Sequence, residues 1–156
     1  METQAKDVMT RDFHALSPDI TIWEAVTRFK HATREENRRI FGMIVTDDSG
    51  NMIGMLSMYD ILLFLRPKHI DIWGEMEDII PEGVFNTSLD RMKSLLVSDL
   101  MTTEVISISP DTNLLMIIEV MIKYHIRRIP VIQDKTILGM VYISDVFYSV
   151  LQQCRE

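Results

Sequence analysis

Apolar residues recur at helical spacing in two stretches of the chain. In each stretch they stand three and four positions apart, which places them on one face of a helix. A helix with one apolar face buries that face against another element. The residues that define these faces are Ile22, Ala25, Val26 and Phe29 in the first stretch and Leu114, Leu115, Ile118, Met121 and Ile122 in the second.

Short β-branched runs before and after these helices predict strands. Residues 105–108 alternate and predict a strand before the second helix, and residues 14–16 are its weaker counterpart. After each helix the pattern predicts a β-hairpin, with a polar turn at residues 47–50 in one and at residues 134–135 in the other. Pro130 suits only the first residue or the edge of a strand.

The two stretches are copies of one unit. Asp7-Val8-Met9-Thr10 matches Asp99-Leu100-Met101-Thr102, and Ser17-Pro18-Asp19 matches Ser109-Pro110-Asp111, both at an offset of 92 residues (99 − 7). Gly54 and Asp60 match Gly139 and Asp145 at an offset of 85 (139 − 54). A final helix is expected to begin near Asp60 and near Asp145. The sequence therefore predicts an α/β (α+β) fold of two β-α-β-β-α repeats, each with a three-stranded sheet, packed with pseudo-twofold symmetry.

These matches divide the chain into residues 6–66 as repeat one, residues 67–97 as a connection and residues 98–153 as repeat two. The connection carries its own helical apolar face, so we expect a structured crossover. The apolar residues of that face are Ile70, Trp73, Met76 and Ile80.

Composition and charge narrow the function. The formal charge of −7 argues against a broad basic surface for nucleic acid, and no apolar run reaches the roughly 18 residues of a membrane span. The lone Cys154 excludes an internal disulfide, and the sequence lacks a signal-peptide pattern, so we expect a cytoplasmic protein. The four scattered histidines have no metal-ligand spacing, and phosphate-loop, dinucleotide-binding and hydrolase motifs are absent from the sequence, so we expect neither a metal site nor an enzyme.

The ordered motifs resemble those of the cystathionine-β-synthase (CBS) domain. The features are a Gly-x-x-[Ser/Thr]-x-x-Asp run at the end of the unit, complete in the first copy and with Tyr142 at the Ser/Thr position in the second, the Ser-Pro-Asp turn and the strand Arg127-Arg128-Ile129-Pro130-Val131. Two units in tandem resemble a CBS pair, or Bateman module. This resemblance implies two clefts between the repeats that take adenosine-containing ligands (AMP, ADP, ATP or S-adenosylmethionine), and a homodimer formed through helices.

Two interpretations of Asp60 and Asp145 remain open. A carboxylate at these positions can accept hydrogen bonds from both ribose hydroxyls, or it can cap the helix that begins there. Ser57 and Ser144 likewise can donate to a phosphate or satisfy the helix start. In the second copy Tyr142 replaces the expected Ser or Thr. A phenol there can block a phosphate, stack elsewhere or change the ligand preference.

The resemblance also assigns partners to each cleft. The resemblance places Arg127 and Arg128 in the same cleft as Asp60, where they would bind the phosphate of the ligand. The alternative is that they lie at a solvated helix end. Arg39 is a looser match, because the first copy carries about five extra residues there, and surface charge is the interpretation that the sequence favours. The first cleft comprises Met55, Ser57, Tyr59, Asp60, Ile106, Arg127 and Arg128. The second comprises Thr10, His14, Arg39, Tyr142, Ser144 and Asp145.

The sequence thus favours a regulatory module that senses an adenosyl ligand and passes the signal to a partner protein by changing its conformation or its dimer contacts. The alternative is a dimerisation scaffold with vestigial clefts. Twelve methionines fit either apolar cores or an adaptable binding surface.

Overall fold

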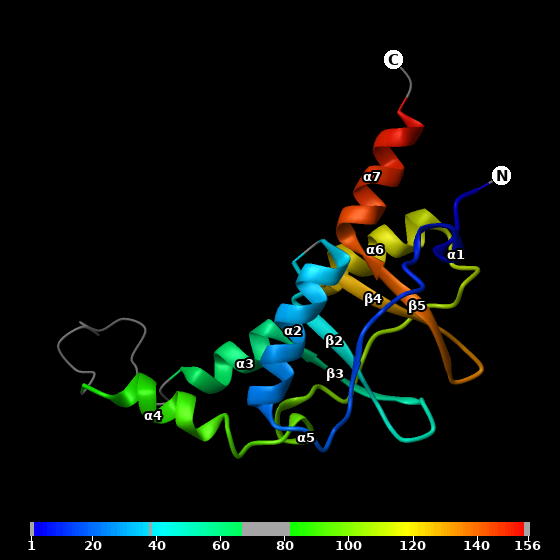
Figure 1. Cartoon of the computed structure of the whole chain (residues 1–156). Helices are drawn as coiled ribbons and strands as arrows, with labels where there is room; N and C mark the ends of the chain where they lie inside the picture. Colours follow the sequence, from blue (N-terminus) through cyan, green and yellow to red (C-terminus); the bar gives the residue numbers. More distant parts are fainter. Residues whose placement is uncertain (1, 38, 67–81, 155–156) are drawn as a thin grey trace. The chain divides into compact units, whose positions relative to one another are not determined.

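The computed structural model describes residues 2–37, 39–66 and 82–154. Each copy contains a long helix, a β-hairpin and a further helix in that order, as the repeat predicts (Figure 1). In chain order the elements are α1 (Ala5–Val8), β1 (Ala15–Leu16), α2 (Ile22–Glu36), β2 (Gly42–Thr46), β3 (Met52–Ser57), α3 (Met58–Leu65), α4 (Val84–Arg91), α5 (Val97–Leu100), α6 (Leu114–Tyr124), β4 (Arg128–Gln133), β5 (Thr136–Tyr142) and α7 (Ile143–Gln153).

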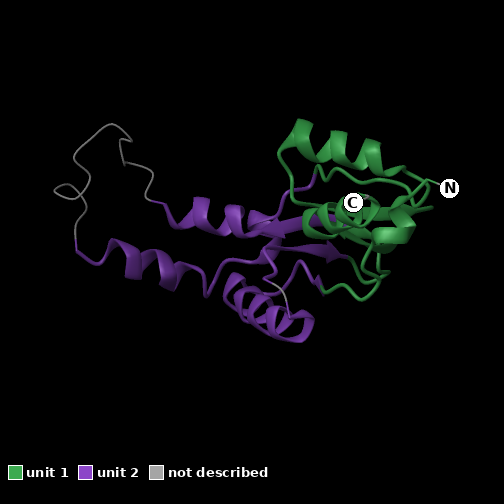
Figure 2. Ribbon diagram, turned by 90° about the horizontal axis from the view of Figure 1, so that it is seen from above, with its two compact units in different colours: residues 1–14, 47–52, 104–156 green, residues 15–46, 53–103 purple. Residues whose placement is uncertain are grey.

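The chain forms two compact units that do not follow the order of the sequence (Figure 2). Unit 1 combines residues 1–14 and 47–52 with residues 104–156, and unit 2 combines residues 15–46 with residues 53–103. The segment that begins each copy therefore lies in the unit that contains the main body of the other copy.

Unit 2 is built on a sheet in the order β1-β2-β3. Strand β1 runs parallel to β2, with Ala15 opposite Ile44 and Leu16 opposite Val45. Helix α2 begins where the Thr21 side chain accepts a hydrogen bond from the backbone N–H of Glu24 at 3.1 Å, a standard N-cap. Of the predicted apolar face, Ile22 and Ala25 are buried and Val26 and Phe29 are half-buried, and Ala32 is a further buried position.

Unit 1 repeats the same plan with a smaller sheet. Asn113 caps α6 by accepting from the backbone N–H of Met116 at 2.9 Å, and it stands 92 residues after Thr21. Strands β4 and β5 are antiparallel, and both turn residues, Asp134 and Lys135, have positive φ, as a two-residue type I′ hairpin requires. The core of unit 1 comprises Ala5, Ile117, Met121, Ile129, Val131, Val141 and Val146.

Each copy's leading segment is held by backbone hydrogen bonds to the body of the other copy. In unit 1, Thr10 and Met140 exchange two bonds of 2.8 and 2.9 Å, and the N–H of Ala5 donates to Thr112 O at 2.8 Å. In unit 2, Thr102 and Met55 exchange two bonds of 2.8 and 2.9 Å. These bridges occupy matching positions in the two units, so the exchange obeys the same internal symmetry as the sequence.

Two matching glycines allow this close approach. A Cβ atom at Gly139 would lie 2.7 Å from the carbonyl oxygen of Thr10, and one at Gly54 would lie 2.8 Å from that of Thr102. Both obstacles are backbone atoms that are fixed by the bridges themselves. Glycine is therefore the residue that fits at these two positions.

The structure corrects the predicted second sheet. Residues 105–108 contribute one parallel bridge, between Ile108 and Val131, so unit 1 has a two-stranded sheet and not the three-stranded one expected. The weaker run at 14–16 does contain a strand, β1, because its two residues pair fully with β2. Pro130 is the third residue of β4, and its carbonyl accepts from the N–H of Ile108, so its nitrogen faces the edge away from β5.

The connection between the copies is described in part. Helix α4 occupies Val84–Arg91. The apolar face predicted from Ile70, Trp73, Met76 and Ile80 lies outside the described residues. In the described ranges, no helix is both long enough and apolar enough to cross a membrane.

Replacing either glycine by alanine should weaken the fold. Gly54→Ala and Gly139→Ala are each expected to lower the free energy of unfolding by about 1–3 kcal/mol, because the added methyl group pushes the exchanged segment away. Urea unfolding measures this loss, and amide hydrogen exchange at Thr10 and Met140 locates it for Gly139→Ala. Ser49→Ala, in an exposed turn, is the control. Stabilities within about 0.5 kcal/mol of the unchanged protein for both glycine variants would contradict the role of the close approach.

Candidate functional site

Asp60 lies in a hydrogen-bonded helix start in unit 2. Strand β3 ends at Ser57 and helix α3 begins at Met58, so Ser57 is the N-cap and Asp60 is the third helical residue. The Asp60 Oδ2 atom accepts from the N–H and from the hydroxyl of Ser57, both at 2.9 Å, and the Asp60 N–H donates to Ser57 Oγ at 3.2 Å. This is a capping box.

The structure thereby resolves the open question about the helix start. Neither aspartate is the N-cap residue, since the caps are Ser57 and Tyr142, and Asp60 and Asp145 each stand three residues later. The helices therefore begin two residues before the aspartates. Of the two interpretations of the serines, the one in which serine satisfies the helix start holds for Ser57, whereas the exposed Ser144 is the second residue of α7.

A residue that the sequence interpretation did not include completes the surroundings of Asp60. The Thr102 hydroxyl donates to Asp60 Oδ1 at 3.4 Å, and the backbone of Thr102 is fixed by its bridge to Met55. Its counterpart by repeat is Thr10. The offset of 92 residues that revealed the repeat was sufficient to identify Thr102, because Thr10 was already assigned to the second cleft.

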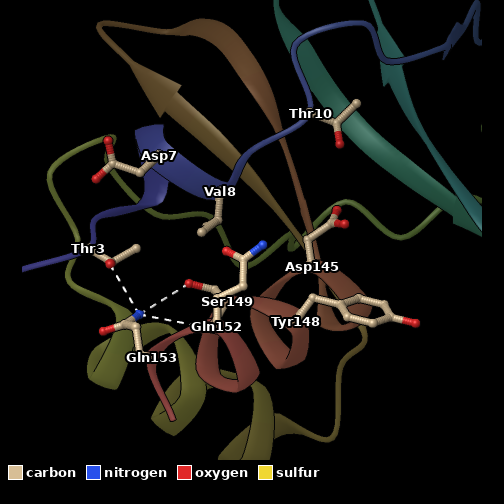
Figure 3. A pocket seen from close by; sticks show the side chains of 9 residues that line it. All are labelled: Thr3, Asp7, Val8, Thr10, Asp145, Tyr148, Ser149, Gln152 and Gln153. Atoms are coloured by element: carbon tan, nitrogen blue, oxygen red, sulfur yellow. Dashed lines mark hydrogen bonds between the residues drawn. The ribbon is translucent and has the colours of Figure 1, made fainter. Parts of the chain in front are cut away.

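Asp145 lines a pocket of about 470 Å³ in unit 1, which we call the α1/α7 pocket (Figure 3). One wall is the N-terminal segment and the other is helix α7. Figure 3 shows Asp145 beside Thr10 on one side and Asp7 on the opposite side. The nine lining residues are Thr3, Asp7, Val8, Thr10, Asp145, Tyr148, Ser149, Gln152 and Gln153.

The α7 wall is a regular stripe. Asp145, Tyr148, Ser149 and Gln152 follow one another at spacings of three, one and three residues, which puts them on one helix face. The Gln153 amide donates to the Thr3 hydroxyl at 3.3 Å and joins the two walls. A polar stripe of this kind is also what a solvent-facing helix surface shows, so the sequence alone did not identify it as a pocket wall.

The volume and the lining together suit a small polar ligand. Ligand pockets commonly enclose about 300–1,000 Å³ and offer a few convergent polar groups. The hydroxyls of Thr3, Thr10 and Ser149 can donate or accept, and the Asp145 carboxylate can accept from paired hydroxyls. A second pocket, of about 220 Å³ in unit 2, is apolar and lies between α2 and α3. Its lining residues are Val26, Phe29, Ile40, Phe41, Met58, Ile61 and Leu62.

The remaining predicted site residues are distributed over the two units. Met55 precedes Ser57 on β3 in unit 2, and Tyr59 is 69% exposed on α3. Ile106, Arg127 and Arg128 belong to unit 1, whereas Asp60 belongs to unit 2, and their assignment to one site stays a prediction.

The second predicted cleft divides in the same way. His14 belongs to unit 1 and Arg39, which is exposed, to unit 2. The carbonyl of Arg127 accepts from the N–H of Ile143 at 2.8 Å, so the backbone of Arg127 contacts the first turn of the helix that carries Asp145. Among the described residues, no group of three or more His, Cys, Asp or Glu side chains could hold a metal ion.

The chain belongs to the CBS domain family. The sequence model of that family matches residues 5–67 and 97–152, one copy in each half of the chain. The fold agrees, since CBS-pair proteins of known structure share it over nearly the whole chain.

Three proteins illustrate how similar this chain is to other members of the family. The mitochondrial CBS domain-containing protein CBSX3 of Arabidopsis thaliana is 44% identical over 66 residues, which is 41% of this chain and 32% of CBSX3. CBSX2 of Arabidopsis thaliana, solved in complex with AMP, is 22% identical with a TM-score of 0.70, covering 97% of this chain and 98% of CBSX2. The CBS domain pair of protein MJ0100, solved with 5′-methylthioadenosine and S-adenosyl-L-methionine, is 19% identical with a TM-score of 0.69, covering 99% and 100%. At these identities the two structures show a shared fold.

The capping role of Ser57 can be measured separately from any ligand. Ser57→Ala is expected to lower the free energy of unfolding by about 1 kcal/mol, because the N–H of Asp60 loses its acceptor and the carboxylate loses a donor. Ser144→Ala, the same change at an exposed second helical position, is the control and should cost a few tenths of a kcal/mol at most. Denaturant unfolding without ligand compares the two, and equal losses would exclude the cap.

Proposed function

We propose that this chain is a regulatory module that binds an adenosine-containing ligand at sites built around Asp60 and Asp145. The single observation that carries the proposal is the α1/α7 pocket, in which Thr10 and Asp145 come from opposite ends of the chain and line one cavity. Membership of the CBS family and the adenosyl ligands in the CBSX2 and MJ0100 structures support it.

The role proposed for each aspartate is to accept hydrogen bonds from the ribose hydroxyls. Capping and ribose binding are compatible at Asp60, because the Ser57 bonds occupy Oδ2 and leave Oδ1 with one long contact to Thr102. A carboxylate oxygen has two lone pairs, so Oδ1 has capacity for a ribose hydroxyl. Thr102 and Thr10 would then orient the carboxylate or the sugar in the two sites.

The same geometry suggests how binding becomes a signal. A ligand in the α1/α7 pocket would contact both the N-terminal segment and α7 and would add a further connection between them. Ligand that binds this closed arrangement preferentially shifts the equilibrium toward it. A partner protein that contacts α7 would then sense the change.

A binding assay tests the proposal. AMP, ATP, adenosine and S-adenosylmethionine are added to the full chain, and at least one should raise the unfolding temperature. A ligand at 100 times its Kd stabilises by about 2.7 kcal/mol, roughly 5–11 °C for a protein of this size. Asp60→Asn keeps the capping acceptor of α3. Both Asp60→Asn and Asp145→Asn replace a carboxylate by an amide that faces the ribose, so each should weaken binding at its own site. The pair together should abolish it.

Matched controls carry the same change on the surface. Asp48→Asn and Asp134→Asn remove one charge in the exposed hairpin turns and should bind as the unchanged protein does. Absence of heat and of a thermal shift with every ligand, on ligand-free protein, would leave the scaffold interpretation.

We also propose that the chain forms a homodimer through its helices. Large apolar side chains are exposed on α3 and α7, among them Leu62 at 55% and Phe147 at 60%, and a second copy would cover such faces. Helix-mediated pairing is what the family resemblance implies. The apolar pocket between α2 and α3 lies against Leu62 and would receive a side chain of the second copy.

Charge at these positions should separate the dimer. Leu62→Glu and Phe147→Glu are each expected to shift the protein toward a monomer in analytical ultracentrifugation, because a carboxylate is costly to bury. Ser49→Glu in the exposed turn adds the same charge away from these helices and should leave the mass unchanged. If the unchanged protein sediments as a monomer at every concentration, the dimer proposal is wrong.

A further inference from the structure

The α1/α7 pocket has an unusual charge for a nucleotide site. Two of its nine lining residues, Asp7 and Asp145, are acidic, and the other seven are uncharged. None of the described residues that line it is Lys, Arg or His. Figure 3 shows the two carboxylates on opposite sides, so a ligand that fills the pocket approaches one of them at either end.

Basic residues near these elements in the sequence do not line the pocket. Lys6, next to Asp7, forms an ion pair with Asp111 at 3.4 Å. Arg127 contacts the start of α7 through its backbone carbonyl, and it is not a lining residue. Positive charge therefore does not come from the pocket wall.

This distribution of charge matters for the ligand. A phosphate group carries up to two negative charges and is bound in proteins by arginine, lysine or several N–H donors. The Asp7 carboxylate repels it, and the repulsion at an exposed side chain is reduced by salt. A neutral or positively charged substituent meets hydroxyls, amides and carboxylates that can all accept hydrogen bonds.

We propose that the α1/α7 pocket selects phosphate-free adenosyl ligands, either a neutral nucleoside or thioether or a cationic sulfonium compound, over nucleotides. The inference rests on the proposed function of Asp145 as a ribose acceptor. Asp7 is the residue that gives the preference, since it adds a second carboxylate and its own structural bond, from the N–H of Gln4 at 2.9 Å, is one that asparagine can also accept.

Titration calorimetry of the full chain tests the preference. Asp60→Asn serves as the background so that the Asp145 site is observed alone. The probes are adenosine, 5′-methylthioadenosine, S-adenosylmethionine and AMP. At an ionic strength of about 0.05 M, AMP should bind at least about tenfold more weakly than adenosine. The ratio of the two dissociation constants, which we call the AMP/adenosine ratio, should fall at about 0.5 M.

Asp7→Asn should lower the AMP/adenosine ratio by about threefold or more without changing the affinity for adenosine. Asp134→Asn is the matched control, because it removes a charge from the exposed β4–β5 turn of the same unit. It should leave the AMP/adenosine ratio unchanged.

The outcomes separate the two proposals. AMP binding as tightly as adenosine in an Asp145-dependent manner would overturn the preference and leave the proposed function intact. If Asp134→Asn and Asp7→Asn lowered the AMP/adenosine ratio equally, the preference would also be overturned, because the net charge of the protein and not the pocket lining would then determine the ratio. Absence of binding by all four probes to the unchanged protein would overturn the proposed function itself.

Discussion

The exchange of leading segments between the two copies is the constraint on which the rest of the structure depends. Each segment makes main-chain hydrogen bonds to the body of the other copy, ending in a two-bond bridge at Thr10 or Thr102. Such bonds contribute roughly 0.5–1.5 kcal/mol each, so the set is a substantial part of a marginal stability. Because Gly139 and Gly54 face these bridges with no Cβ, the segments can lie directly on the strands. Neither copy is a self-sufficient folding unit in this arrangement.

The exchange also builds the candidate sites. A threonine brought from a distant part of the chain reaches the strand that leads to each aspartate, Thr102 toward Asp60 and Thr10 toward Asp145. Each strand leads directly into the helix that carries the aspartate, and at Asp60 the capping box fixes the carboxylate. Residues that are far apart in sequence thus meet through backbone pairing, and a ligand bound between them would report whether that pairing is intact.

The sequence predicted the repeat, the helices α2 and α6 and both hairpins, because hydrophobic spacing and turn residues are local signals. It overestimated the strand at 105–108, since β-branched residues favour extended backbone but cannot supply a partner along their full length. Both helix starts were placed two residues late. At α7 the tyrosine at 142 is an untypical cap, and at α3 both Ser57 and Asp60 are residue types that commonly cap helices, so the aspartate was taken for the cap. The pocket wall was missed for another reason. Tyr148, Ser149 and Gln152 belong to no motif. They line a pocket only because the N-terminal segment lies opposite them, and the sequence does not show that placement.

The two units share a backbone plan but differ in the side chains at each helix start. Ser57 bonds to Asp60 in a capping box, whereas the side chain of Tyr142 makes no cap hydrogen bond at the start of α7. Under the proposed function, the small side chain of Ser57 would leave room for a phosphate beside Asp60, whereas the phenol of Tyr142 would block a phosphate, stack elsewhere or change the ligand preference. Asp145 lines the α1/α7 pocket, and the second acidic residue of that pocket, Asp7, comes from the exchanged segment. If both aspartates bind ligand as proposed, these few side-chain differences within one backbone plan would give the chain two sites with different ligand chemistry.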